Sequence, residues 1–272
     1  MDAPSREVRR FYLPCRTVED YSLACSADFE AERETDVAQL QRMPSIRINP
    51  AELLPFGQRW AALGGRLSRT PPYSSAQLGS LFNKAVSEAL SSMLGGIRIV
   101  EIKKRVLLPP QPDCVEVGDI WIIGAIRPQQ YDVVYRPDGV RFAFDSKTLN
   151  DTKSIGKNLQ NMINDLGTEA ANVHSRFPHA VVGFIVALPR PSLMPGQQAR
   201  ATETLGRLAE RATVGDVPYK AEAVSLVVWN PVDGTVDADI PARSSPLRLE
   251  RFSEHVEQAY VSRYAGLPPH DR

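Results

Sequence analysis

The chain has 272 residues, of which 43% are hydrophobic and 24% charged, proportions that fit a folded protein and exclude a disordered one. Lysine plus arginine and aspartate plus glutamate each total 32, which argues against a protein that coats nucleic acid indiscriminately but permits a local basic cleft. No apolar run approaches the roughly 18 residues of a membrane span, so none is expected.

The N-terminal part of the chain has the weakest structural signals. Residues 18–43 predict one or two helices, and the prolines and glycines that recur between Pro50 and Pro72 predict a connecting segment. The first ten residues lack the apolar core of a signal peptide. The three cysteines form no CxxC pair, so we expect reduced thiols and a cytoplasmic protein.

The central part gives clear periodic signals. Apolar residues recur at helical spacing from Leu78 to Leu94, with Ser75 as the expected N-cap and Gly95-Gly96 as the expected end. Residues 97–108 and 119–126 then predict two strands.

Residues 131–147, YDVVYRPDGVRFAFDSK, predict a two-stranded hairpin with a turn at Arg136–Gly139. Because side chains alternate along a strand, Asp145 and Lys147 must share one face. If Tyr135 pairs with Val140, Asp132 joins them on that face, whereas a three-residue loop would turn Asp132 away. The sequence leaves these two registers open, and we expect Phe142 and Phe144 on the other face to pack against the helix that follows.

Helical periodicity resumes at Ile155 and continues to about residue 176, and the apolar run 180–188 predicts a strand buried on both faces. Strand, helix and strand form a βαβ crossover. Farther along, residues 221–229 predict a strand and residues 252–264 a closing helix.

The hairpin carries chemistry as well as structure. Two carboxylates can hold Mg²⁺, which prefers oxygen ligands and keeps several waters. The metal can polarise a phosphodiester and acidify a water. Lys147 can position or deprotonate that water, with a depressed pKa if it is buried, or neutralise charge on the phosphate.

Asp132, a hairpin, Asp145-Ser146-Lys147, a helix and a buried strand together resemble the PD-(D/E)xK nuclease superfamily. The resemblance covers residues 76–188. It implies an α/β fold with a restriction-endonuclease-like core, that is, a mixed central sheet flanked by helices, within a single domain of residues 1–272. Residues 1–70, an N-terminal helical and recognition region, and residues 189–272, a strand–helix extension, are then family-specific additions.

The resemblance also assigns roles to residues. Asp132 and Asp145 become the metal ligands, and Asp145 and Lys147 the Asp-x-Lys pair, although Gln130-Tyr131 stand where the family name has proline. Asp119 is a rival for the first ligand. Glu88 on the first helix is a further catalytic candidate, with a solvated helical face as the alternative. Around the crossover helix, the candidates for DNA contact are Lys153, Lys157, Gln160 and Asn161, for which ordinary surface is the alternative.

These expectations favour a Mg²⁺-dependent endonuclease of double-stranded DNA, most like a sequence-specific type II restriction enzyme acting as a homodimer. Residues 1–70 and the segment 189–246 would then supply recognition and dimerisation. The alternatives are a junction or transposition nuclease, a non-catalytic DNA-binding or assembly protein on a decayed nuclease fold, and an unrelated α/β ligand-binding protein. The last predicts that Asp132 and Asp145 diverge in space.

Overall fold

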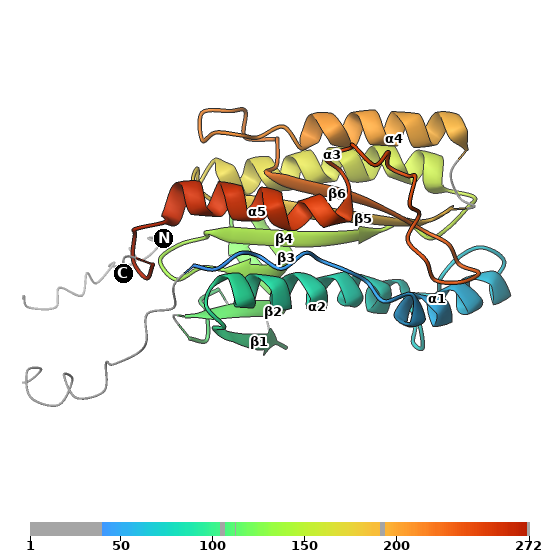
Figure 1. Ribbon diagram of the computed structural model, residues 1–272, viewed down its shortest axis with the longest axis horizontal. Helices are drawn as coiled ribbons and strands as arrows, with labels where there is room; N and C mark the ends of the chain where they lie inside the picture. Colours follow the sequence, from blue (N-terminus) through green and yellow to red (C-terminus); the bar gives the residue numbers. More distant parts are fainter. Residues whose placement is uncertain (1–39, 104–106, 112, 191–193, 271–272) are drawn as a thin grey trace, which may run out of the picture. The chain divides into compact units, whose positions relative to one another are not determined.

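A computed structural model describes residues 40–103, 107–111, 113–190 and 194–270 (Figure 1). The predicted helices of segment 18–43 therefore lie almost entirely outside the described residues, as do Cys15 and Cys25. Cys114 is a buried free thiol. Within the described ranges, no helix is long and apolar enough to cross a membrane.

A six-stranded mixed sheet forms the centre of the protein, as predicted. Its strands lie in chain order, β1 (Arg98–Ile102), β2 (Cys114–Ile123), β3 (Pro128–Tyr135), β4 (Phe142–Thr148), β5 (Val181–Pro189) and β6 (Ala223–Trp229). The pairs β2–β3 and β3–β4 are antiparallel, whereas β1–β2, β4–β5 and β5–β6 are parallel. Both β5 and β6 are buried along their whole length, which explains their nearly continuous apolar sequences.

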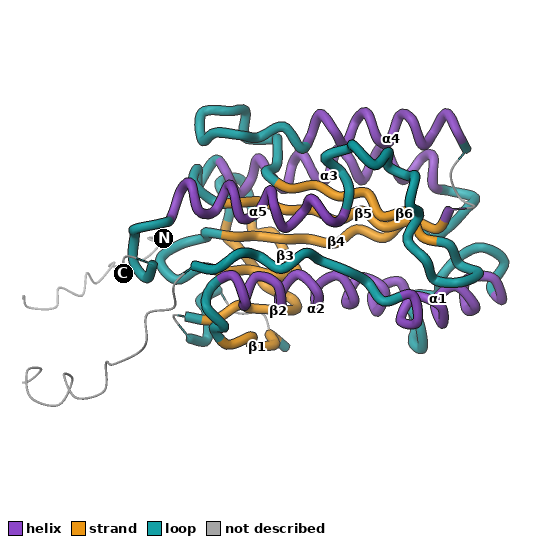
Figure 2. Tube along the Cα trace, in the orientation of Figure 1, coloured by secondary structure: helices purple, strands orange, loops and turns teal. Residues whose placement is uncertain are grey.

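Helices cover both faces of this sheet (Figures 1 and 2). On one face, α2 (Ser75–Met93) and α5 (Leu249–Tyr264) share a hydrophobic core with β3 and β4. On the other face, α3 (Ile155–His174) and α4 (Pro195–Leu208) lie side by side and pack on β5 and β6. The α/β architecture with a mixed sheet flanked by helices is confirmed.

The hairpin adopts neither of the two registers considered from the sequence. Val133 faces Phe144, Val134 faces Ala143 and Tyr135 faces Phe142, so a six-residue connection replaces the tight turn. Within this connection, buried Arg136 makes a bidentate ion pair with Glu116, while Arg141 binds Asp138 and its backbone N–H donates to the Tyr135 carbonyl at 3.0 Å. This register differs from the Tyr135–Val140 pairing by two residues, which preserves the face on which each side chain lies.

Phe142 and Phe144 do not pack against the crossover helix, contrary to the prediction. They belong to the core under α2 and α5, where Phe144 meets Phe252 edge-on with ring centroids 5.8 Å apart. Ala143, which points the other way, packs in the core that includes α3. The alternation was therefore correct, and the side of the sheet to which α3 returns was misassigned.

Three helix predictions also need correction. A helix, α1 (Pro50–Ala62), replaces part of the predicted connecting segment, because Asn49 caps it and Pro50 occupies its first turn, where no N–H is needed. Helix α2 begins one residue earlier than expected, at a capping box formed by Ser74 and Gln77. Helix α4 was not predicted, since only Ala201, Leu205 and Leu208 are buried along it.

Candidate metal-dependent hydrolytic site

The middle strands bring the three predicted hairpin residues together. Asp132 lies on β3, one residue before the first rung that pairs with β4, and its Oδ2 accepts hydrogen bonds from Ser146 N (3.0 Å) and Ser146 Oγ (2.8 Å). Lys147 Nζ donates to Asp145 Oδ2 from the same face of β4. The Asp132 and Asp145 carboxyl groups interact directly and shift each other's pKa. The two aspartates therefore do not diverge.

A fourth charged residue, Glu169, completes the cluster from α3, and sequence reasoning missed it. Its Oε1 accepts from Lys147 Nζ at 3.0 Å and from Gln129 Nε2 at 3.2 Å, while Tyr131 Oη donates to its backbone carbonyl at 2.9 Å. Glu169 is only 4% exposed. It follows Leu166 and precedes Ala170 and Val173 on the helical stripe, so a carboxylate on the buried side of α3 was the available signal.

The cluster holds three carboxyl groups and one ammonium, since Asp145 and Glu169 contact Lys147 and Asp132 adjoins Asp145. Burial makes this excess of negative charge unfavourable. Burial raises the pKa of Asp132 to about 7, the Asp145 carboxylate adds to the rise, and the hydrogen bonds from Ser146 oppose it. Burial also raises the pKa of Asp145, to about 6, against the lowering effect of the Lys147 ammonium. Both carboxyl groups therefore release their protons closer to neutral pH than ordinary aspartates do.

Lys147 does not behave as predicted for a buried lysine. Burial alone would lower its pKa, but the attraction of the Asp145 and Glu169 carboxylates outweighs burial and raises the pKa above its usual value. The ammonium therefore stays protonated. This electrostatic setting favours a role in charge stabilisation over a role as general base.

The donor set fits a magnesium ion held by two carboxylates. No group of three or more histidine, cysteine, aspartate or glutamate side chains in the described ranges is arranged to hold a metal, but Mg²⁺ needs only one or two carboxylates besides water. Glu169 Oε2 is buried and has no hydrogen-bond partner among the described residues, so the cluster has acceptor capacity to spare. Asp132 and Asp145 would hold the ion.

Two other predicted candidates lie apart from this cluster. Helix α2 approaches it at Gly79, where an added Cβ would lie 3.0 Å from Ser146 Oγ. Glu88 is nine residues farther along, about 13 Å at the rise of an α-helix, and lines a groove with Arg47 and Ala85. Asp119, the rival first ligand, is exposed beside a bulge in β2 and accepts from Gln130 Nε2 at 2.7 Å. Within the described ranges, no hydrogen bond or ion pair joins either residue to Asp145.

The predicted DNA-contact residues Lys153, Lys157, Gln160 and Asn161 are all exposed at the N-terminal end of α3 or just before it. They lie on the crossover between β4, which carries Asp145 and Lys147, and β5. Their role stays a prediction.

Comparison of the chain with protein-family models, with curated proteins and with solved structures finds no match. The resemblance to the PD-(D/E)xK superfamily thus rests on the motif and on the order of the elements around it.

Proposed function

We propose that this protein is a Mg²⁺-dependent endonuclease that hydrolyses phosphodiester bonds of double-stranded DNA, with Asp132, Asp145 and Lys147 at its centre. One observation supports the proposal: a partly buried cluster at the end of a hairpin that holds three carboxyl groups and one ammonium. Asp145 and Glu169 contact the Lys147 ammonium, and Asp132 adjoins Asp145. A divalent cation would relieve this excess charge, and oxygen ligands are what Mg²⁺ prefers.

The residues of the cluster have separate roles in hydrolysis. Asp132 and Asp145 would hold the ion, which would supply Lewis-acid polarisation of the scissile phosphate and a more acidic water. Lys147, kept protonated by Asp145 and Glu169, stabilises negative charge that grows on the phosphate. Glu169 positions the lysine through its 3.0 Å contact, and the Lys147 side chain remains 27% exposed, which leaves it accessible to an incoming substrate.

Cleavage of supercoiled plasmid DNA with Mg²⁺ tests the proposal. We expect Lys147→Ala to lower the cleavage rate on the order of 10²–10³-fold, the loss typical for one transition-state donor. Asp145→Asn should lower it at least as much. Asp119→Asn is the matched control, since it removes an exposed carboxylate on the neighbouring strand and should cut at the wild-type rate.

Discrete fragments would support sequence-specific cleavage of the restriction type, and sedimentation would test the predicted homodimer. Wild-type protein that binds duplex DNA with Mg²⁺ but cuts neither plasmid nor branched DNA would instead favour the non-catalytic alternative. Equal loss in Asp119→Asn and Asp145→Asn would contradict the assignment of the ligands.

A further inference from the structure

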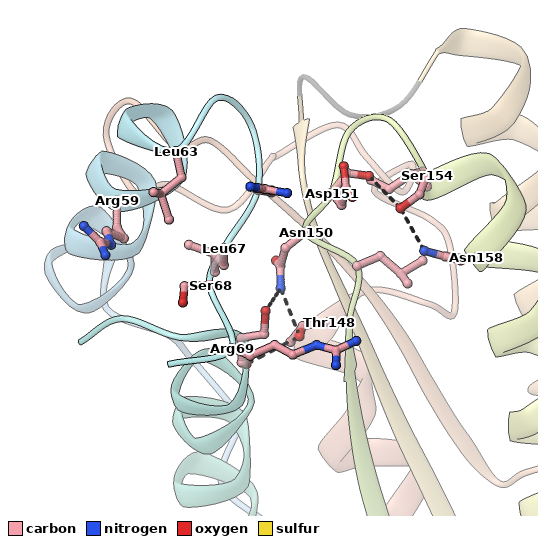
Figure 3. A pocket seen from close by; sticks show the side chains of 14 residues that line it. Arg59, Leu63, Leu67, Ser68, Arg69, Thr148, Asn150, Asp151, Ser154 and Asn158 are labelled. Atoms are coloured by element: carbon pink, nitrogen blue, oxygen red, sulfur yellow. Dashed lines mark hydrogen bonds between the residues drawn. The ribbon is translucent and has the colours of Figure 1, made fainter. Parts of the chain in front are cut away.

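A polar groove of about 620 Å³ opens beside the carboxyl end of β4. One wall comes from the end of α1 and the chain that follows it, with Arg59, Arg66 and Arg69. The other wall comes from the chain after β4 and the first turn of α3, with Ser154 and Asn158. In Figure 3, Asn150 lies between the walls, with Arg59 and Leu67 on one side and Ser154 and Asn158 on the other.

Hydrogen bonds between the two walls of the groove hold its shape. Trp60 Nε1 donates to the carbonyl of Asn150 at 2.7 Å, and Thr152 N donates to the carbonyl of Gly65 at 3.1 Å. Gly65 has φ +89 and would clash with Thr152 if it carried a Cβ, only 2.9 Å from its Oγ1. The arginine-bearing segment is thereby held at a fixed distance from β4.

The charge of the groove is positive and uncompensated. Three arginines and one carboxylate, Asp151, line it, which gives a formal net charge of 3 − 1 = +2. No ion pair joins Arg59, Arg66 or Arg69 to a carboxylate within the described ranges, and the buried Nε of Arg59 has no hydrogen-bond partner there. Arginines that fold without partners are available for an anion, and their fork geometry suits phosphate.

The floor residue, Asn150, supplies a second and independent signal. It is 6% exposed, its Nδ2 donates to Ser75 Oγ and Thr148 Oγ1 at 3.1 Å each, and its Oδ1 has no partner in the described ranges. Both neighbours are hydroxyls, which can donate as well as accept, so the amide can turn over and accept from both, at the cost of the 3.5 Å bond from Thr148 Oγ1 to the Ser75 carbonyl. Turned in this way, it presents an N–H donor to the groove.

The opposite wall ends in the N-terminus of α3. Ser154 caps this 20-residue helix without a side-chain hydrogen bond to its backbone, and the helix dipole adds partial positive charge there. Thr148, on the groove, directly follows Lys147 on β4, so an anion in the groove lies next to the strand end that carries the candidate site.

From these contacts we infer that the groove binds the phosphate backbone of duplex DNA and guides it toward Asp145 and Lys147, an inference that rests on the proposed function. Arg59, Arg66 and Arg69 bind successive phosphates, Asn150 donates from the floor, and the N-terminus of α3 faces the same strand. The predicted contacts at Lys153 and Lys157 then extend this track along the rim.

Equilibrium binding of duplex DNA in EDTA tests the inference separately from cleavage. For Arg66→Ala/Arg69→Ala we expect affinity to fall on the order of tenfold, and the slope of log K against log [salt] to fall by about 2. The matched control is Arg98→Ala/Arg207→Ala, which removes the same charge from exposed arginines outside the groove and should change neither quantity.

A second variant, Asn150→Asp, keeps the shape of the floor and accepts from both hydroxyls, but places a negative charge opposite the arginines. It should fold with a wild-type circular dichroism spectrum and bind DNA more weakly than wild type. Equal losses in the groove and control arginine variants would overturn the inference. So would a wild-type protein that binds inorganic phosphate but no duplex.

Asp145→Asn separates the two proposals. Binding that depends on the groove arginines, together with a wild-type protein that never cleaves, would support the groove and contradict the nuclease. Cleavage that needs Asp145 but is unaffected by Arg66→Ala/Arg69→Ala, with unchanged binding, would support the nuclease and overturn the groove.

Discussion

The protein contains two buried charged clusters with opposite electrostatics. Around Glu222, which immediately precedes β6, one carboxylate accepts from Arg211 at 2.9 Å, Arg263 at 2.8 Å, His174 at 3.2 Å and the Val182 N–H at 2.8 Å. Around Asp145, the Lys147 ammonium is shared by two carboxylates, Asp145 and Glu169, and a third carboxyl group, Asp132, adjoins Asp145. In the first cluster both carboxylate oxygens have partners, and the unpaired buried atoms among the described residues are donors, Arg211 Nε and Arg263 Nη2. The second cluster retains an excess of negative charge and an unpaired carboxylate oxygen on Glu169.

The pKa values of the two clusters shift in opposite directions. Burial alone would raise the pKa of Glu222, but His174, Arg263 and the Val182 N–H outweigh it and lower the pKa. Burial raises the pKa of Asp132 and Asp145 with no sufficient compensation. A satisfied cluster holds elements together, whereas an unsatisfied one is retained at the expense of stability, as is common where a ligand binds.

The largest effect should come from breaking the satisfied cluster. Glu222→Gln leaves Arg211 and Arg263 buried without a counter-charge, and we expect unfolding free energy to fall by about 3–5 kcal/mol. Urea denaturation at pH 7 measures this. The control is Glu210→Gln, whose solvent-screened surface pair with Lys220 should contribute far less. Similar losses of stability in both variants would show that the Glu222 cluster stabilises the fold no more than a surface ion pair does.

The unsatisfied cluster should respond in the opposite way. Asp132→Asn removes one crowded carboxyl group but keeps an acceptor for Ser146, so at pH 8 without metal we expect stability to rise by about 1–2 kcal/mol. Because the folded pKa of about 7 lies above the unfolded value of about 3.9, the folded state binds more protons, and its stability falls as pH rises between these values.

Urea midpoints of wild type and Asp132→Asn, measured from pH 4 to pH 8, check this. The gain in the variant should grow with pH through that window and vanish near pH 4. A difference in stability that does not change with pH would show that the pKa of Asp132 is not raised. A negative difference would show that the Asp132 carboxyl group stabilises the fold, as Glu222 does.

Magnesium should have a smaller but related effect. At a concentration ten times its dissociation constant, bound Mg²⁺ would add about 1.4 kcal/mol, which for a chain of this size raises Tm by roughly 3–6 °C. The shift should be larger at pH 8 than at pH 5, where the pKa values of about 7 and about 6 leave Asp132 and Asp145 protonated.

Thermal melts with Mg²⁺ and without it, at both pH values, measure the effect, and Asp132→Asn/Asp145→Asn is the control. Equal shifts at both pH values, or an undiminished shift in the control, would place magnesium elsewhere.

The sequence predicted the parts of the fold and site that depend on local period. Alternation placed Asp145 and Lys147 on one face, and apolar periodicity located α2, α3, β5 and α5. Features that depend on contacts between residues far apart in the chain could not be predicted from the sequence. The six-residue connection depends on Arg136 reaching Glu116, 20 residues away in the chain, and no short pattern encodes that contact.

The site residues that the sequence did not reveal are also brought into place by contacts between distant parts of the chain. Glu169 joins Lys147 only because α3 returns over the face that carries Asp145, and the face chosen by a crossover helix is a tertiary property. Asn150 and the groove arginines come together through Trp60, on a helix that its prolines concealed, and through Gly65, which follows that helix.

The strands follow one another across the sheet in the order in which they occur in the chain. No strand has to be inserted between two that have already paired, so the sheet can assemble by sequential addition, with a modest entropic penalty for each loop closed. The hairpin that carries Asp132, Asp145 and Lys147 precedes α3, β5 and β6 in this order. Its crowded carboxyl groups can therefore approach one another while the nascent chain is still solvated, before Glu169 and the layer formed by α3 and α4 bury them.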